Sequence, residues 1–194
     1  MFIAIDVGGP VREDARRIRE RLRIERRDAE SALRWVDPQQ MHLTLRFIGE
    51  TDDASAARLV GAFRDQFAVR RFAYEVAAPS WFPNPSRPRV LVREVTQGRD
   101  EIASIVDEVE GRMREASVVA DADRKPFRPH ITLARVREGR ERALRAVPAD
   151  WWAAAAPSGS VATSVDRVSI VNSELTPRGP VYRVLAESAL TGVS

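Results

Sequence analysis

The two histidines of this 194-residue chain both begin the same four-residue pattern. His42-Leu43-Thr44-Leu45 and His130-Ile131-Thr132-Leu133 each read His-x-Thr-Leu. If each pattern forms a strand, the alternation of side chains places its histidine and threonine on one face and its apolar residues behind them. Two imidazoles and two hydroxyls brought together would form a site for acid and base chemistry on a phosphate.

Paired histidines suit in-line attack at phosphorus. One neutral imidazole can take a proton from the attacking oxygen, and one imidazolium can give a proton to the leaving oxygen. The ordinary histidine pKa near 6.5 lets both protonation states exist around neutral pH. The hydroxyls of Thr44 and Thr132 can donate hydrogen bonds to the non-bridging oxygens, where negative charge builds up in the transition state.

Other kinds of site fit the sequence less well. Zinc normally takes three or four protein ligands, whereas the chain has two histidines, no cysteine and no carboxylate at ligand spacing beside either motif. No Gly-x-Ser-x-Gly elbow, P-loop or Gly-x-Gly-x-x-Gly fingerprint is present. We therefore expect a site that uses no metal and no cofactor.

Two arginines and several aromatic residues are candidates for substrate contact. Arg46 lies two residues after Thr44 and Arg128 lies two before His130, so simple alternation places both on the histidine face. Pro129 makes the count less regular for Arg128, and a plain surface role is the alternative for Arg46. Aromatic side chains can stack on RNA bases or fill the core. The aromatic candidates are Phe127, Trp35, Trp81 and Phe82.

Composition describes an ordinary globular protein of one large domain or two small lobes. Hydrophobic residues make up 44% of the chain, and cysteine is absent, which fits a reducing compartment. The net charge is +3 and comes almost wholly from arginine, since Lys125 is the one lysine. No apolar run is long enough for a membrane helix, and the N-terminus lacks the basic segment of a signal peptide. We expect a cytoplasmic protein.

The elements that must position the motifs do not alternate strictly between strand and helix. This order favours an α+β fold with antiparallel sheets, and the 88-residue spacing of the motifs suggests an internal duplication. Residues 79–88 are too rich in proline for a central strand, 119–129 form a polar connection, and 172–180 form a loop. Strands are expected over 2–7, 33–36, 42–48, 72–78, 89–95, 130–136, 165–171 and 181–186, and helices over 10–27, 53–67, 100–115 and 140–146.

The motifs and their surroundings resemble the 2H phosphoesterase superfamily. The closer resemblance is to its bacterial and archaeal branch, the RNA 2′,3′-cyclic phosphodiesterases historically linked to 2′-5′ RNA ligase. Both motif blocks, an opening strand, a middle segment and a C-terminal signature carry this resemblance, which therefore covers most of the chain. These segments are residues 2–5, 41–50, 82–91, 127–135 and 173–182.

The resemblance implies one domain over residues 1–194, with two pseudo-symmetric lobes of antiparallel sheet and outer helices around a central cleft. It implies metal-independent hydrolysis of an RNA 2′,3′-cyclic phosphate to a 2′-phosphomonoester, with His42 as proton donor and His130 as proton acceptor. The nearly identical motifs cannot by themselves assign these two roles. The expected partner is RNA or a nucleotide with a cyclic phosphate end, and we expect a monomer.

Two other functions remain open from the sequence. The same site could run backwards as an ATP-independent 2′-5′ RNA ligase, because an RNA hydroxyl can replace water as the attacking group. A non-catalytic RNA-binding module could use the same basic surface, although binding alone does not need two acid/base residues.

Overall fold

One large sheet organises the protein. In the computed structural model, which describes residues 1–118, 126–156, 161–177 and 179–192, the strand order is β4-β11-β10-β1-β3-β8-β7-β5-β9, with β2 beside β8 and β6 beside β7. Neighbouring strands are antiparallel, except that β11 and β4 are parallel. The strands are β1 (Phe2–Asp6), β2 (Leu33–Trp35), β3 (His42–Phe47), β4 (Phe67–Arg70), β5 (Phe72–Val76), β6 (Ser80–Asn84), β7 (Arg87–Gln97), β8 (His130–Val136), β9 (Ala162–Val165), β10 (Arg167–Thr176) and β11 (Gly179–Thr191).

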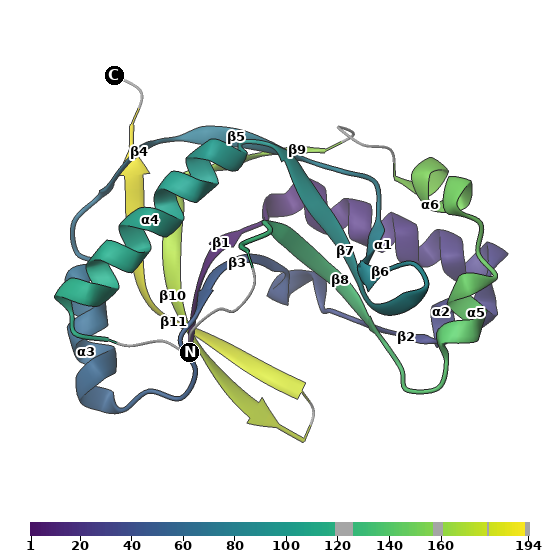
Figure 1. The fold of residues 1–194 in the computed structure, drawn as a ribbon, viewed down its shortest axis with the longest axis horizontal. Coiled ribbons are helices and arrows are strands. Elements are labelled where there is room, and N and C mark those ends of the chain that lie inside the picture. The colour runs from purple at the N-terminus through teal and green to yellow at the C-terminus, as the bar shows by residue number, and fades with distance from the viewer. Residues whose placement is uncertain (119–125, 157–160, 178, 193–194) are drawn as a thin grey trace.

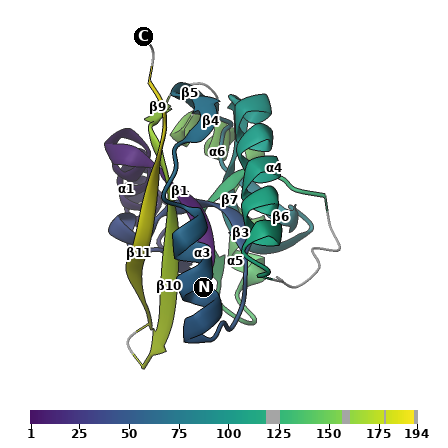
Figure 2. The ribbon, with the colours of Figure 1, turned by 90° about the vertical axis from the view of Figure 1, so that its left-hand side faces the viewer.

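The helices lie in two groups, one at each half of the sheet (Figure 1). The group beside β3 and β4 consists of α3 and α4, and the group beside β2 and β9 contains the remaining helices. The β10–β11 hairpin extends beyond the other strands in both side views (Figures 1 and 2). The helices are α1 (Gly8–Glu25), α2 (Arg27–Ser31), the 3-10 turn η1 (Pro38–Gln40), α3 (Asp53–Ala62), α4 (Arg99–Glu115), α5 (Glu141–Arg145) and α6 (Ala149–Ala155).

The two halves repeat each other around the motif strands. Asp6 of β1 lies opposite His42 of β3, and Glu94 of β7 lies opposite His130 of β8. Both the acidic residues and the histidines are separated by 88 positions. The helix that follows each outer strand crosses to the other half, because α1 contacts β9 whereas α4 contacts β3 and β4. The expected duplication is therefore present in the strand register.

The two halves meet where β3 pairs with β8. Leu43 opposite Ile131 is the residue pair that joins these strands. Further along β8, β2 takes the place of β3, with Trp35 opposite Ala134 and the Val36 amide donating to the Leu133 carbonyl at 2.9 Å. The sheet is consequently continuous at one point and opens on either side of it.

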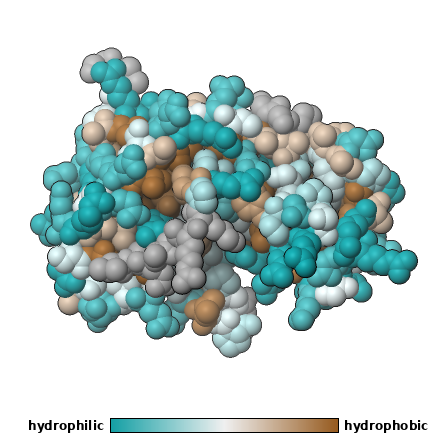
Figure 3. All heavy atoms as spheres, viewed as in Figure 1, coloured by the Kyte–Doolittle hydropathy of each residue, from teal (hydrophilic) through white to brown (hydrophobic). Residues whose placement is uncertain are grey.

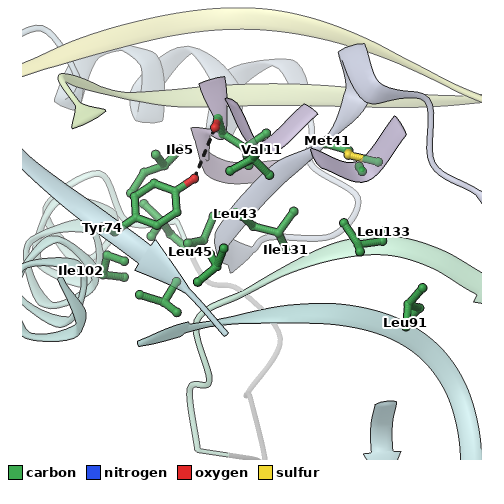
Figure 4. Close-up of a cluster of buried hydrophobic side chains, with 14 of the residues drawn as sticks. Ile5, Val11, Met41, Leu43, Leu45, Tyr74, Leu91, Ile102, Ile131 and Leu133 are labelled. Atoms are coloured by element: carbon green, nitrogen blue, oxygen red, sulfur yellow. Dashed lines mark hydrogen bonds between the residues drawn. The ribbon is translucent and has the colours of Figure 1, made fainter. Parts of the chain in front are cut away.

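The apolar residues of both motifs form the centre of the core (Figure 4). Leu43, Leu45, Ile131 and Leu133 are all buried. Tyr74 lies among them, and its hydroxyl donates to the Val7 carbonyl at 3.4 Å. The alternation expected for the motifs thus holds, since their apolar side chains face inward and leave the histidines and threonines on the opposite face.

A buried ion pair connects α1 to β7. Arg93 is 1% exposed and forms a short contact with the carboxylate of Asp14, which is also buried. The Arg93 Nε donates to the Ala77 carbonyl at 2.6 Å, so the guanidinium is bound on two sides. Burial lowers the pKa of Arg93, and the neighbouring Asp14 carboxylate opposes that change. Since α1 follows β1, this pair ties the first half of the chain to the central strand of the second half.

Most of the expected elements occur, and two expectations about loops and ends were wrong. The helix expected to reach residue 67 ends at Ala62, where Arg112 donates to the carbonyls of Ala62, Asp65 and Gln66 and holds the chain in a turn before β4. Residues 172–180, expected to be a loop, lie largely within the paired strands β10 and β11. The prolines of 79–88 are accommodated because β6 pairs on one side with β7.

Four short elements were not expected from the sequence: α2, β4, α6 and β9. Each has at most seven residues, too few for a clear period in hydrophobicity. The connection expected over 119–129 lies mostly outside the described residues. Among the helices that the structure describes, none is both long and apolar enough to cross a membrane.

We predict that Asp14→Asn lowers the free energy of unfolding by about 3–5 kcal/mol, because it leaves a buried guanidinium without its carboxylate. Urea unfolding measures this loss. The matched control is Glu13→Gln, which removes an exposed ion pair with Arg16 and should cost less than about 1 kcal/mol. The double variant Asp14→Leu/Arg93→Met should recover most of the stability, and equal losses in Asp14→Asn and Glu13→Gln would contradict the role given to the buried pair.

Candidate active site

Both motifs line a single cleft of about 1700 Å³. His42, Thr44, His130 and Thr132 all contribute to its surface. The cleft face of the sheet is the one opposite the core, because the intervening Leu43 and Ile131 are fully buried. The four residues expected to do chemistry are therefore gathered in one place.

The strand register places each histidine beside the threonine of the other motif. Because Leu43 lies opposite Ile131 in an antiparallel pair, His42 falls opposite Thr132 and Thr44 falls opposite His130. The two histidines are then diagonal neighbours across the pair, a relation with a backbone separation of about 7–8 Å. A phosphate placed over this pair would lie between the two rings, with a hydroxyl on each side.

The His42 ring is fixed by a hydrogen bond and by two aromatic rings. Its Nδ1 lies 2.8 Å from the Gln40 carbonyl, so we assign the proton to Nδ1 and leave Nε2 for the cleft. Phe2 stacks on the imidazole with centroids 4.5 Å apart, and Tyr182 meets it edge-on at 5.5 Å. Burial among these groups lowers the pKa of His42, since it penalises the charged ring more than the hydrogen bond to Gln40 stabilises it.

His130 is held in an equivalent way. Its Nδ1 lies 2.7 Å from the Arg128 carbonyl, again two residues earlier in the chain. The ring contacts Phe82 with centroids 4.7 Å apart. Both histidines therefore present Nε2 as the free ring nitrogen, and each is supported by one phenyl ring.

Phe82 is the predicted aromatic that lines the cleft. Trp81 was predicted to contact substrate, but it is 8% exposed and packs against Trp152 at 5.3 Å, because the next residue of a strand faces the other side of the sheet. Phe127 is 41% exposed but is not part of the cleft surface. Trp35, by contrast, borders the cleft.

The guanidinium of Arg128 lies behind the site and not on the cleft surface. It bonds the Glu94 carboxylate at 2.7 Å and lies 4.4 Å from the Phe82 ring centroid. The prediction that Arg128 places positive charge at the phosphate is therefore wrong in detail. Instead, its backbone carbonyl holds His130 and its side chain covers the far side of Phe82.

Arg46 was predicted to face the cleft, and a β-bulge explains why it does not. Thr44 pairs with Ala4 and Arg46 pairs with Ile3, so Leu45 is an extra residue in β3. An extra residue reverses the side-chain alternation beyond it. Arg46 consequently forms an ion pair with Glu110 of α4 at 3.0 Å, and Phe47 takes the position on the cleft surface.

The same bulge occurs at the equivalent position of β8. Thr132 pairs with Val92 and Ala134 pairs with Leu91, which leaves Leu133 as the extra residue. Arg135 therefore lines the cleft. Sequence reasoning assigned no role to Arg135 or Phe47, and the signal that would have found them is a bulge one residue after each threonine.

The described residues contain no group of three or more His, Cys, Asp or Glu side chains that could hold a metal ion. The acidic neighbours of the histidine strands are engaged elsewhere. Asp6 pairs with Arg12, and Glu94 pairs with Arg128.

Comparison with known proteins gives a consistent result. The model of the family "LigT like Phosphoesterase" matches residues 5–92 and 94–182, so each matched segment contains one motif. An RNA 2′,3′-cyclic phosphodiesterase from Aeropyrum pernix is 33% identical over 160 residues, covering 80% of this chain and 85% of the relative. One from Thermotoga maritima is 30% identical over 195 residues, covering 98% and 95%.

Solved structures share the fold. A protein from Thermus thermophilus superposes with a TM-score of 0.67 at 28% identity, covering 98% of this chain and 97% of that one. E. coli LigT, crystallised with 3′-AMP, gives a TM-score of 0.71 at 22% identity with the same coverage.

We predict that NMR titration of the unliganded protein gives His42 a pKa below the ordinary value of 6.5, because burial disfavours the imidazolium. With two histidines in the chain, the two imidazole signals can be assigned from single substitutions. Phe2→Ala removes the stacked ring, admits water and should move the His42 pKa upward. Phe82→Ala, which removes the ring beside His130, is the matched control and should leave the His42 pKa in place. A His42 pKa above 6.5, or one indifferent to Phe2→Ala, would show that burial does not control this group.

Proposed function

This chain belongs to the LigT-like phosphoesterase family, and we propose that it hydrolyses RNA 2′,3′-cyclic phosphate ends to 2′-phosphomonoesters. The observation that carries the proposal is the placement of both His-x-Thr-Leu motifs on the surface of one cleft. Curated relatives of 33% and 30% identity bear the name RNA 2′,3′-cyclic phosphodiesterase, which supports the same substrate class.

The proposed reaction is an in-line displacement at phosphorus. Water attacks the phosphorus atom, the bond from phosphorus to the 3′ oxygen breaks, and the phosphate remains on the 2′ oxygen. Nε2 of His130 accepts the proton of water, while Nε2 of His42 donates a proton to the departing 3′ oxygen. Both ring positions suit these roles, because each Nδ1 is already bound to a backbone carbonyl.

The surroundings of His42 are compatible with its role as the proton donor. A lowered pKa makes the imidazolium a stronger acid towards the leaving oxygen. The negative charge of the cyclic phosphate favours the protonated ring once substrate is bound, which offsets the effect of burial.

Charge on the phosphate is neutralised by hydroxyls and not by a resident metal ion in this proposal. Thr44 and Thr132 lie on opposite sides of the site by register, so their hydroxyls can donate to different non-bridging oxygens. Hydrogen bonds aimed at developing charge in a site of low polarity contribute substantially to the rate.

Replacing either histidine tests the mechanism. We predict that His42→Gln and His130→Gln each lower kcat for a 2′,3′-cyclic mononucleotide by about 10²–10⁴-fold, since each removes one proton-transfer step. The thermal unfolding midpoint of each variant serves as the control for folding. A folded variant that retains near-full activity would contradict the two-histidine mechanism.

The product and its metal dependence test the proposed reaction. We predict that a cyclic-ended oligoribonucleotide yields a 2′-phosphate and a free 3′-hydroxyl, and that prior treatment with EDTA leaves the rate unchanged. Chromatography against authentic 2′- and 3′-phosphate standards identifies the product. A 3′-phosphate, a ligated 2′-5′ product in excess over hydrolysis, or loss of activity in EDTA would each overturn part of the proposal.

A further inference from the structure

Phe47 is an exposed aromatic residue inside the candidate active-site cleft. Its side chain is 60% exposed, although it sits at the end of a strand whose other apolar side chains are buried. It reaches the cleft because of the bulge at Leu45. A phenyl ring left open to water in a binding cleft gains free energy when a flat apolar surface covers it.

Phe47 is connected to the catalytic centre through aromatic contacts. It lies opposite Phe2 in the β1–β3 pair, and the two ring centroids are 6.2 Å apart. Phe2 in turn stacks on His42 at 4.5 Å. A ligand resting on Phe47 would therefore lie within one nucleoside's reach of a phosphate held at His42.

The internal repeat shows how the two ends of the cleft differ. Phe47 follows His42 by five residues, and Arg135 follows His130 by five residues. Both side chains line the cleft beyond equivalent bulges. One end therefore offers a phenyl ring, whereas the other offers the guanidinium of Arg135 with Arg34 as its cross-strand neighbour.

Charge decides which part of a nucleotide suits each end. Glu50 and Asp53, which follow β3, also line the cleft, and their carboxylates disfavour a phosphate there. Leu175, 85% exposed on the projecting hairpin, adds apolar surface to the same cleft, and Figure 3 shows an apolar spot on that hairpin. The end that contains Phe47 is thus suited to an uncharged aromatic group, and the arginine end is suited to an anion.

We propose that Phe47 is the stacking platform for the nucleobase of the nucleotide that carries the cyclic phosphate. The inference rests on the proposed function, because it takes that nucleotide as the substrate. Stacking on a ring does not depend on the hydrogen-bonding pattern of the base. The subsite therefore accepts all four bases and binds purines, with their larger rings, more tightly than pyrimidines.

The test compares substrates with and without a base. Steady-state kinetics are measured on adenosine 2′,3′-cyclic phosphate and on methyl ribofuranoside 2,3-cyclic phosphate, which lacks a base. Phe47→Ala should raise KM for the adenosine substrate by about 5–150-fold, the effect expected for loss of one stacked base. It should leave kcat, and the KM of the baseless substrate, close to wild type. Phe47→Trp should restore the low KM.

Phe127→Ala is the matched control, since it removes another exposed phenylalanine that does not line the cleft, and it should change neither constant. An unchanged KM for the adenosine substrate in Phe47→Ala would overturn the inference, as would an equal loss for both substrates. If the wild-type protein hydrolyses neither compound, the proposed function itself fails, and that result is distinct from failure at Phe47.

Discussion

The pairing of Leu43 with Ile131 is the constraint on which the candidate site depends. It joins the two halves of the sheet and sets the register that brings each histidine beside the threonine of the other motif. A slip of one residue would turn an entire motif strand over and exchange its buried and cleft-facing side chains. The leucines that follow each threonine resist such a slip because they are buried in the shared core.

The halves are held around this pair by exchange of helices. The helix after β1 packs against the second half and the helix after β7 packs against the first, so neither half buries its apolar surface alone. The buried Asp14–Arg93 pair reinforces the exchange at a residue directly opposite Ile131. The backbone repeat then carries different side chains, since Phe2 covers His42 whereas Phe82, backed by Arg128, covers His130.

The motif strands and most helices could be predicted from the sequence, because period and turn residues are local signals. The convergence of His42 and His130 could be predicted only as a consequence of the repeated pattern, and the structure places both in one cleft. Arg46 and Trp81 were misplaced for different local reasons: a bulge reversed the alternation for Arg46, and strand pairing turned Trp81 inward. Such effects depend on partners distant in the sequence, so no count along a single strand reveals them.

The central claim is that two imidazoles from opposite halves of the chain act on one phosphorus atom. A crystal structure of the wild-type protein with a bound 2′-nucleotide product tests it most directly. The account predicts phosphate oxygens within hydrogen-bond distance of Nε2 of both His42 and His130, with a threonine hydroxyl on each side. A phosphate bound at one histidine alone, or outside the cleft between the motif strands, would contradict it.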